Sequence, residues 1–299
     1  MAFKTPDQIA VTAVDAGAAK AHLSPARMLV GGVLAGAYIA FAGLLGIVVT
    51  SGLAPATWGN LPTLVFGLTF STGLILVVIA GAELVTGNMA LLPLAVLQRR
   101  ATTARAGLSL VLVTVGNLLG SLLVAYVFAV KTGVIGSADS PEGSGGALTF
   151  ARLGAVATGK ALTETNSEIF FRAVACNWLV CLAVWMAFAA EDVVGKVFAI
   201  LFPITGFVAM GFDHVVANMF FLPAAVFAHV PDIGWSDVAG NLVFAYLGNF
   251  VGAAVFVAGA YWFLYLRGKD TTATAPNRVQ TTAASDADSK AGQYAAGPR

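Results

Sequence analysis

The chain alternates long apolar stretches with short polar ones, on the length scale of membrane-spanning helices. No charged residue occurs between Met28 and Ala82, whereas one membrane crossing needs only about 20 apolar residues. The segment 52–62, GLAPATWGNLP, interrupts this stretch with Gly, Pro and Asn, as a turn does. The pattern therefore predicts a first helix near 28–50 and a second helix that starts near Leu61.

The remaining apolar stretches predict four further crossings. They cover about 106–130, 170–190, 193–227 with an interruption, and 238–266. We therefore expect an all-α integral membrane protein with six transmembrane helices, which together form one domain over residues 26–268.

The two ends of the chain have a different composition. In residues 1–25, Thr5 is placed to cap a helix, with Pro6 at the first helical position and Gln8 completing a capping box. This pattern predicts a cytoplasmic amphipathic helix at the membrane surface. The segment 269–299 is rich in Thr, Ala, Ser and Asp and offers little to bury, so we expect a disordered cytoplasmic tail.

Composition narrows the possible classes of protein. Only 10% of the residues are charged, against about a quarter in ordinary soluble domains, and the mean hydropathy is +0.85. These values exclude a disordered chain and disfavour a soluble globular one. The net charge of +1 offers no basic surface for nucleic acid. The two cysteines, Cys176 and Cys181, match no metal or redox spacing, and no cofactor or metal is implied.

Lysine and arginine in short connections predict the orientation, because such residues favour the cytoplasmic side. Those on one predicted side are Arg99, Arg100, Arg105, Lys196, Arg267 and Lys269. The long Gly/Ser-rich connection between the third and fourth helices carries three more on the other side, at 131, 152 and 160, which weakens the contrast. On balance both termini are expected to be cytoplasmic, in a multi-pass protein of the cell membrane.

The chain also contains an internal repeat. GAELVTGNMALLPLAVL at 81–97 aligns without a gap to GFDHVVANMFFLPAAVF at 211–227, and roughly half the positions are identical. A second match follows each copy, GNLLG at 116–120 and GNFVG at 248–252, and its small residues allow helices to approach closely. Each copy would contain three helices, so the halves would enter the membrane from opposite sides as a 3+3 inverted repeat.

The repeated segments are expected to interrupt the second and fifth helices. Glu83, Asp213 and His214 lie there, and ionisable groups at membrane depth are costly unless they serve a function. The second half-helices are predicted to begin near Asn88 and Asn218, whose side chains could tie the loose backbone groups. Two helix N-termini meeting near the middle of the membrane would attract anions.

Three segments resemble the signature motifs of the formate/nitrite transporter family: GAELVTGN at 81–88, CNWLVCLAVW at 176–185 and GFDHVVANMFFLP at 211–223. Their order and spacing agree over about residues 5–268. The resemblance implies an aquaporin-like protomer fold, a homopentamer in the lipid bilayer with one pore per protomer, and passage of small monovalent weak-acid anions. These are chiefly formate, nitrite or hydrosulfide.

The resemblance also implies which side chains line the pathway. His214 corresponds to the central pore histidine, and Lys160 to the lysine that draws in anions. The other pathway residues are Leu84, Val85, Thr86, Asn88, Asn177 and Asn218, and the apolar constrictions are Phe70, Leu74, Val180 and Phe207. Glu83 and Asp213 are assigned structural roles at the helix interruptions. Val85 replaces an aromatic residue of some formate-transporting members, which leaves the preferred anion open.

These residues suggest a proton-linked mechanism. An anion pays a large desolvation penalty in an apolar constriction, and a neutral acid pays much less. Imidazole titrates near neutral pH, so His214 could supply a proton to formate or nitrite. The Thr86 hydroxyl could donate or accept a hydrogen bond beside it.

Other functions remain open from the sequence. A water or glycerol channel would share the architecture, but Asn88 and Asn218 are followed by Met rather than by the Pro-Ala of aquaporin signatures. A hydrosulfide-type channel of the same family is a second alternative, and channel and coupled transporter are not distinguished. No nucleophile elbow or HExxH motif indicates an enzyme.

Overall fold

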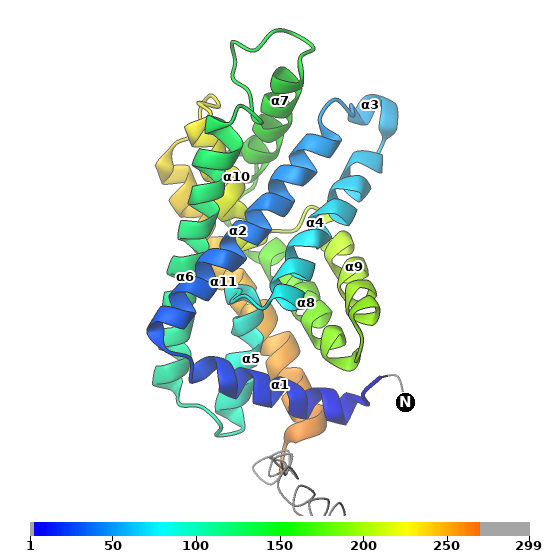
Figure 1. Ribbon diagram of the computed structural model, residues 1–299, viewed down its shortest axis with the longest axis vertical. Coiled ribbons are helices and arrows are strands. Elements are labelled where there is room, and N and C mark those ends of the chain that lie inside the picture. The colour runs from blue at the N-terminus through cyan, green and yellow to red at the C-terminus, as the bar shows by residue number, and fades with distance from the viewer. Residues whose placement is uncertain (1–2, 270–299) are drawn as a thin grey trace, which may run out of the picture. The chain divides into compact units, whose positions relative to one another are not determined.

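The computed structural model describes residues 3–269, and the regular structure in this part of the chain is helical (Figure 1). Five helices there are long and apolar enough to cross a membrane: Pro25–Thr50, Leu61–Ala80, Thr103–Lys131, Asn166–Ala189 and Trp235–Leu266. The prediction of an all-helical protein with several apolar spans is confirmed. Apart from Lys269, the predicted tail at 269–299 lies outside the described residues.

The helices follow one another through short connections. In chain order they are α1 (Pro6–Ala21), α2 (Pro25–Thr50), α3 (Pro55–Trp58), α4 (Leu61–Ala80), α5 (Val85–Leu97), α6 (Thr103–Leu123), α7 (Gly145–Thr158), α8 (Asn166–Ala189), α9 (Val193–Ala209), α10 (Val215–Phe227) and α11 (Trp235–Ala253). Wider π-helical turns form η1 (Val124–Lys131), η2 (Gly159–Thr163), η3 (Ala254–Gly259) and η4 (Trp262–Leu266). The connection between the third and fourth predicted spans therefore contains a helix, α7, that the sequence pattern did not indicate.

Helix α1 begins with the predicted capping box. Gln8 N donates to Thr5 Oγ1 at 3.4 Å, and Thr5 N donates to Gln8 Oε1 at 2.9 Å. The helix lies crosswise at the end of the molecule opposite α7 and packs against α5, α8 and η4 (Figure 1). Ile9 and Val14 are buried, so its apolar stripe is covered by protein rather than free to face lipid.

Two pairs of helices approach closely at the repeated glycines. A β-carbon at Gly120 of α6 would overlap the carbonyl oxygen of Val33 in α2. A β-carbon at Gly252 of α11 would overlap the carbonyl oxygen of Val174 in α8. The close approach expected from GNLLG and GNFVG therefore occurs within the chain.

Glycines mark the two connections in the repeated segments. Gly81 follows α4 with φ 81°, and Gly211 precedes α10 with φ 74°, a left-handed conformation that strains other residues. Helices α5 and α10 begin at Val85 and Val215, each three residues before the predicted start. The reason is tertiary, because the first N–H group of each helix finds a partner on a distant helix.

Candidate functional site

The two connections meet at a hydrogen-bonded pair, Thr86 and His214. Thr86 Oγ1 and His214 Nε2 lie 3.0 Å apart, and both side chains are buried. Ala217 N donates to His214 Nδ1 at 3.2 Å. Because Nδ1 accepts this bond, the neutral imidazole carries its proton on Nε2 and donates it to Thr86. The structure thus brings together two predicted pathway residues and holds His214 as a neutral hydrogen-bond donor.

The start of α5 is held by a buried amide from α6. Asn117 Oδ1 accepts from Val85 N at 2.9 Å. Asn117 Nδ2 donates to the carbonyl oxygens of Gly32, at 2.8 Å, and Glu83, at 2.9 Å. One side chain therefore satisfies three backbone groups that would otherwise be buried without partners.

The start of α10 is held in the same way from α11. Asn249 Oδ1 accepts from Val215 N at 2.8 Å. Asn249 Nδ2 donates to the carbonyl oxygens of Ala173 and Asp213, both at 2.8 Å. The matched arrangement shows that the second match of the repeat, GNLLG and GNFVG, places an asparagine as well as two glycines.

The backbone role predicted for Asn88 and Asn218 was wrong. Their amide groups donate to acidic side chains, Asn88 to Glu83 Oε2 at 3.0 Å and Asn218 to Asp213 Oδ1 at 2.9 Å. The backbone ties come from Asn117 and Asn249 instead. Their equal placement in the two copies was the signal that could have identified them.

A lysine completes the cluster at the α10 connection. Lys160 Nζ lies 2.7 Å from Asp213 Oδ1, and Asp213 is fully buried. Asn218 Nδ2 also donates to Asn241 Oδ1 at 2.8 Å, and Asn241 Nδ2 donates to the Lys160 carbonyl at 3.0 Å. Lys160 and Asn218 therefore lie at one site, because Asp213 Oδ1 contacts both.

A corresponding cluster lies at the α5 connection. Lys20 Nζ is 2.9 Å from Glu83 Oε2, which also accepts from Asn88. Lys20 comes from α1, outside the repeat. Its role was missed because nothing in the sequence near Lys20 indicates that α1 folds back under this connection.

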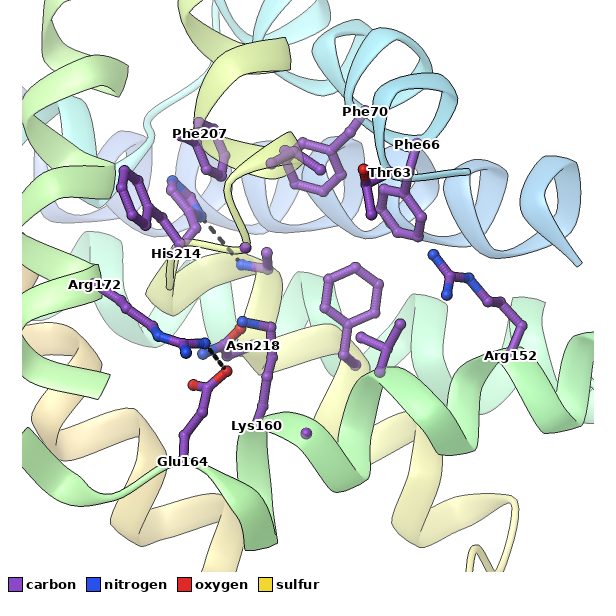
Figure 2. A pocket seen from close by; sticks show the side chains of 17 residues that line it. Thr63, Phe66, Phe70, Arg152, Lys160, Glu164, Arg172, Phe207, His214 and Asn218 are labelled. Atoms are coloured by element: carbon purple, nitrogen blue, oxygen red, sulfur yellow. Dashed lines mark hydrogen bonds and ion pairs between the residues drawn. The ribbon is translucent and has the colours of Figure 1, made fainter. Parts of the chain in front are cut away.

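A cavity of about 210 Å³ opens on the side of α7, and we call it the α7-side cavity (Figure 2). Its lining includes Phe70, Lys160, Phe207, His214 and Asn218. A second cavity of about 340 Å³, the α1-side cavity, is lined by residues that include Lys20, Leu74, Glu83, Leu84 and Asn88. A basic side chain therefore reaches each cavity.

Apolar side chains close the space between the two cavities. The rings of Phe70 and Phe207 meet edge to face at 6.0 Å, and Phe207 stacks on His214 at 6.0 Å. Leu74 and Leu84 are buried on the other side. Figure 2 shows Phe207 just above His214, with Phe70 to the right of both. The part of each cavity nearest to the Thr86–His214 pair is therefore lined by apolar side chains.

Four predicted residues are buried and line neither of these two cavities: Val85, Thr86, Asn177 and Val180. Asn177 Nδ2 donates to the carbonyl oxygens of Thr86, at 3.1 Å, and Asn249, at 2.8 Å. Asn177 therefore positions the Thr86 backbone.

Three charged residues of the α7-side cavity were not predicted: Arg152, Glu164 and Arg172. Arg152 Nε donates to Thr50 Oγ1 at 3.0 Å, and its guanidinium lies over the Phe66 ring. Burial lowers the pKa of Arg152 from its ordinary value, but an arginine stays charged even so. Within the described residues, no group of three or more His, Cys, Asp or Glu could hold a metal ion.

Known proteins resemble nearly the whole chain. A family model described as formate/nitrite transporter matches residues 7–263. A probable formate transporter of Methanothermobacter thermautotrophicus is 45% identical over 274 residues, covering 89% of this chain and 98% of that protein. A solved FNT family ion channel has a TM-score of 0.77 and 31% identity, covering 86% of this chain and 98% of its own. A pentameric formate channel with formate bound has a TM-score of 0.69 and 30% identity, covering 81% and 98%.

Proposed function

Because the chain belongs to the formate/nitrite transporter family, we propose that it is a channel or transporter for formate, nitrite or both. The family and the apolar helices make it a multi-pass membrane protein. One relative is described as a probable formate transporter, and one structural neighbour contains formate. That neighbour is pentameric, which supports a homopentamer here as well.

We further propose six crossings in two inverted halves, with both termini cytoplasmic in the cell membrane. In this arrangement α4 with α5 forms one crossing, and α9 with α10 forms another. The matched ties from Asn117 and Asn249, and the matched lysine–acid–asparagine clusters, support the two halves.

The observation that carries the function is the Thr86–His214 pair, closed in by apolar side chains between two cavities that each receive a lysine. Lys160 and Lys20 would concentrate a small anion on either side. At the pair, His214 Nε2–H and the Thr86 hydroxyl supply hydrogen bonds. The apolar side chains favour the neutral acid over the anion.

Proton transfer at His214 has a structural condition. An imidazolium carries a proton on both nitrogens, whereas Nδ1 accepts the Ala217 N–H. Protonation of His214 therefore requires the first turn of α10 to release this bond. We propose that, during proton-linked passage of the anion, protonation of His214 and release of the Ala217 N–H bond occur together.

The test is uptake into proteoliposomes that contain a pH-sensitive dye. Formate or nitrite outside should acidify the lumen, and faster at lower external pH. His214→Phe should weaken this pH dependence, while the same change at exposed His229 should leave it unaltered. Equal transport across the pH range by His214→Phe and the parent would contradict a proton role. Rapid water or glycerol equilibration without flux of either anion would identify a neutral-solute channel instead.

A further inference from the structure

The α7-side cavity contains an acid that the proposed transport cycle does not use. Glu164 lies between η2 and α8, outside the long apolar helices, and its side chain is only 10% exposed. Glu164 Oε1 accepts from Arg172 at 2.5 Å. Its second oxygen, Oε2, is buried and has no donor among the described residues. Figure 2 shows this side chain beside Arg172 on the cavity wall.

Asp213 has a complementary free oxygen. Its Oδ1 accepts from both Lys160 and Asn218, while its Oδ2 is buried and has no donor in the described part of the chain. Within residues 3–269, both carboxyl groups therefore have one buried oxygen without a donor, and the charges of Lys160 and Asp213 both act on Glu164. Two ionised carboxylates only accept hydrogen bonds, so a proton on one of them is what would allow these two oxygens to bond to each other.

The surroundings place that proton on Glu164. Asp213 Oδ1 already pairs at 2.7 Å with the Lys160 ammonium group. Burial, together with the neighbouring Asp213 carboxyl, raises the pKa of the Glu164 carboxyl to about 7 against the opposing charges of Lys160 and Arg172. Below neutral pH, Glu164 therefore has a proton on a carboxyl group whose Oε2 has no other partner among the residues described, and above neutral pH it becomes ionised.

We propose that Glu164 and Asp213 share one proton, and that its loss weakens anion binding in the α7-side cavity. The idea rests on the proposed transport of weak-acid anions. Three cations belong to this site, Lys160 of η2, Arg152 of α7 and Arg172 of α8. With the proton present they face one carboxylate, and without it they face two. The nearby His214, Asn218 of α10 and Asn241 of α11 are uncharged in this arrangement.

The test is exchange of labelled formate, or nitrite, across proteoliposomes with the same pH on both sides, so that no pH gradient drives flux. Conditions near pH 6 and pH 8 lie on either side of the Glu164 pKa of about 7. The apparent KM of the parent should rise by about threefold or more at the higher pH, since a second negative charge in the same cavity repels the anion by up to about 1 kcal/mol even in water. Glu164→Gln should keep the low KM at both values, with kcat little changed.

Glu168→Gln is the matched control, because Glu168 is an exposed acid one helical turn away that bonds Thr165. It should keep the rise in KM of the parent. Glutamine at 164 retains an oxygen for Arg172 and gains an N–H for Asp213, so folding should be preserved. An unchanged rise in KM in Glu164→Gln, or no rise in the parent, would overturn the proposal.

A second measurement does not depend on transport. Infrared difference spectra of the whole protein should show the carbonyl band of a protonated carboxylic acid that disappears from about pH 6 to pH 8, around the Glu164 pKa of about 7. The band should be absent in Glu164→Gln and present in Glu168→Gln. A parent protein without a titrating band would contradict the shared proton. Failure to transport either formate or nitrite would refute the proposed function but not the shared proton. The infrared titration would then decide whether Glu164 and Asp213 share a proton.

Discussion

Individual asparagines hold the backbone of the candidate site in its working conformation. Asn117 and Asn249 each accept from one N–H group and donate to two carbonyl oxygens. A buried polar group left without a partner costs about 1–3 kcal/mol. Each side chain therefore stabilises its connection by a network rather than by one bond, and the Thr86–His214 pair depends on both.

Asn117→Ala tests this at the residue scale. The change leaves Val85 N–H and the carbonyl groups of Gly32 and Glu83 without their partner. We expect the free energy of unfolding to fall by about 3 kcal/mol or more, which would lower the midpoint of thermal unfolding in detergent. Asn60→Ala is the control, because Asn60 is exposed and its side chain makes no capping bond. Equal midpoints for the two variants would show that the hydrogen bonds of the Asn117 side chain contribute little to the stability of the protein.

Sequence patterns located part of this site and missed another part for a physical reason. His214, Thr86 and Asn218 lie in the repeated motifs, where polar residues in an apolar stretch are conspicuous. Lys20 and Glu164 lie in separate segments and reach the site only through the tertiary fold. Long-range contacts of this kind leave no local pattern, so no periodicity could have indicated them.

Whole helices depend on glycine where their backbones touch. Helix α11 contacts α8 at Gly252, next to the Val174 carbonyl, whereas Gly240 on α11 has open space around it. This difference separates the intrinsic effect of glycine on a helix from its effect on helix packing.

Gly252→Ala is therefore expected to destabilise the protein, because the new methyl group forces α11 away from α8. Gly240→Ala should be neutral or stabilising by up to about 1 kcal/mol, since alanine is the better helix former. Thermal unfolding and the yield of folded protein in detergent measure both. A Gly252→Ala protein as stable as Gly240→Ala would mean that the helices separate at little cost.

The elements themselves were largely predictable from hydropathy. The long apolar helices occur close to the expected ranges, and α1 begins at its predicted cap. The starts of α5 and α10 were misplaced because remote asparagines, and not local propensity, satisfy their first N–H groups. Helix α7 was missed because its Gly-rich sequence resembles a loop.

The whole molecule exposes much apolar surface. Val111, Phe171, Phe202 and Leu264 each have more than 60% of their surface accessible. In a membrane protein such surface faces lipid or neighbouring subunits, so it does not by itself give the oligomeric state.

Chemical cross-linking of the purified protein tests the proposed homopentamer. We expect a ladder of bands that ends at five subunits, and a native mass of five chains in gentle detergent. A ladder that ends at one or two subunits under the same conditions, with transport retained, would contradict the pentamer and leave the pathway within each chain unaffected.

The two lysines have unlike origins, although the acids that they pair with are matched. Lys20 is carried on the crosswise helix α1, and Lys160 on the π-helical turn η2. The α1-side cavity and the α7-side cavity can therefore change independently in evolution, because a substitution in α1 requires no substitution in η2. If the protein transports its solute as proposed, this asymmetry between the lysines, around matched asparagine ties, would allow faster passage in one direction than in the other.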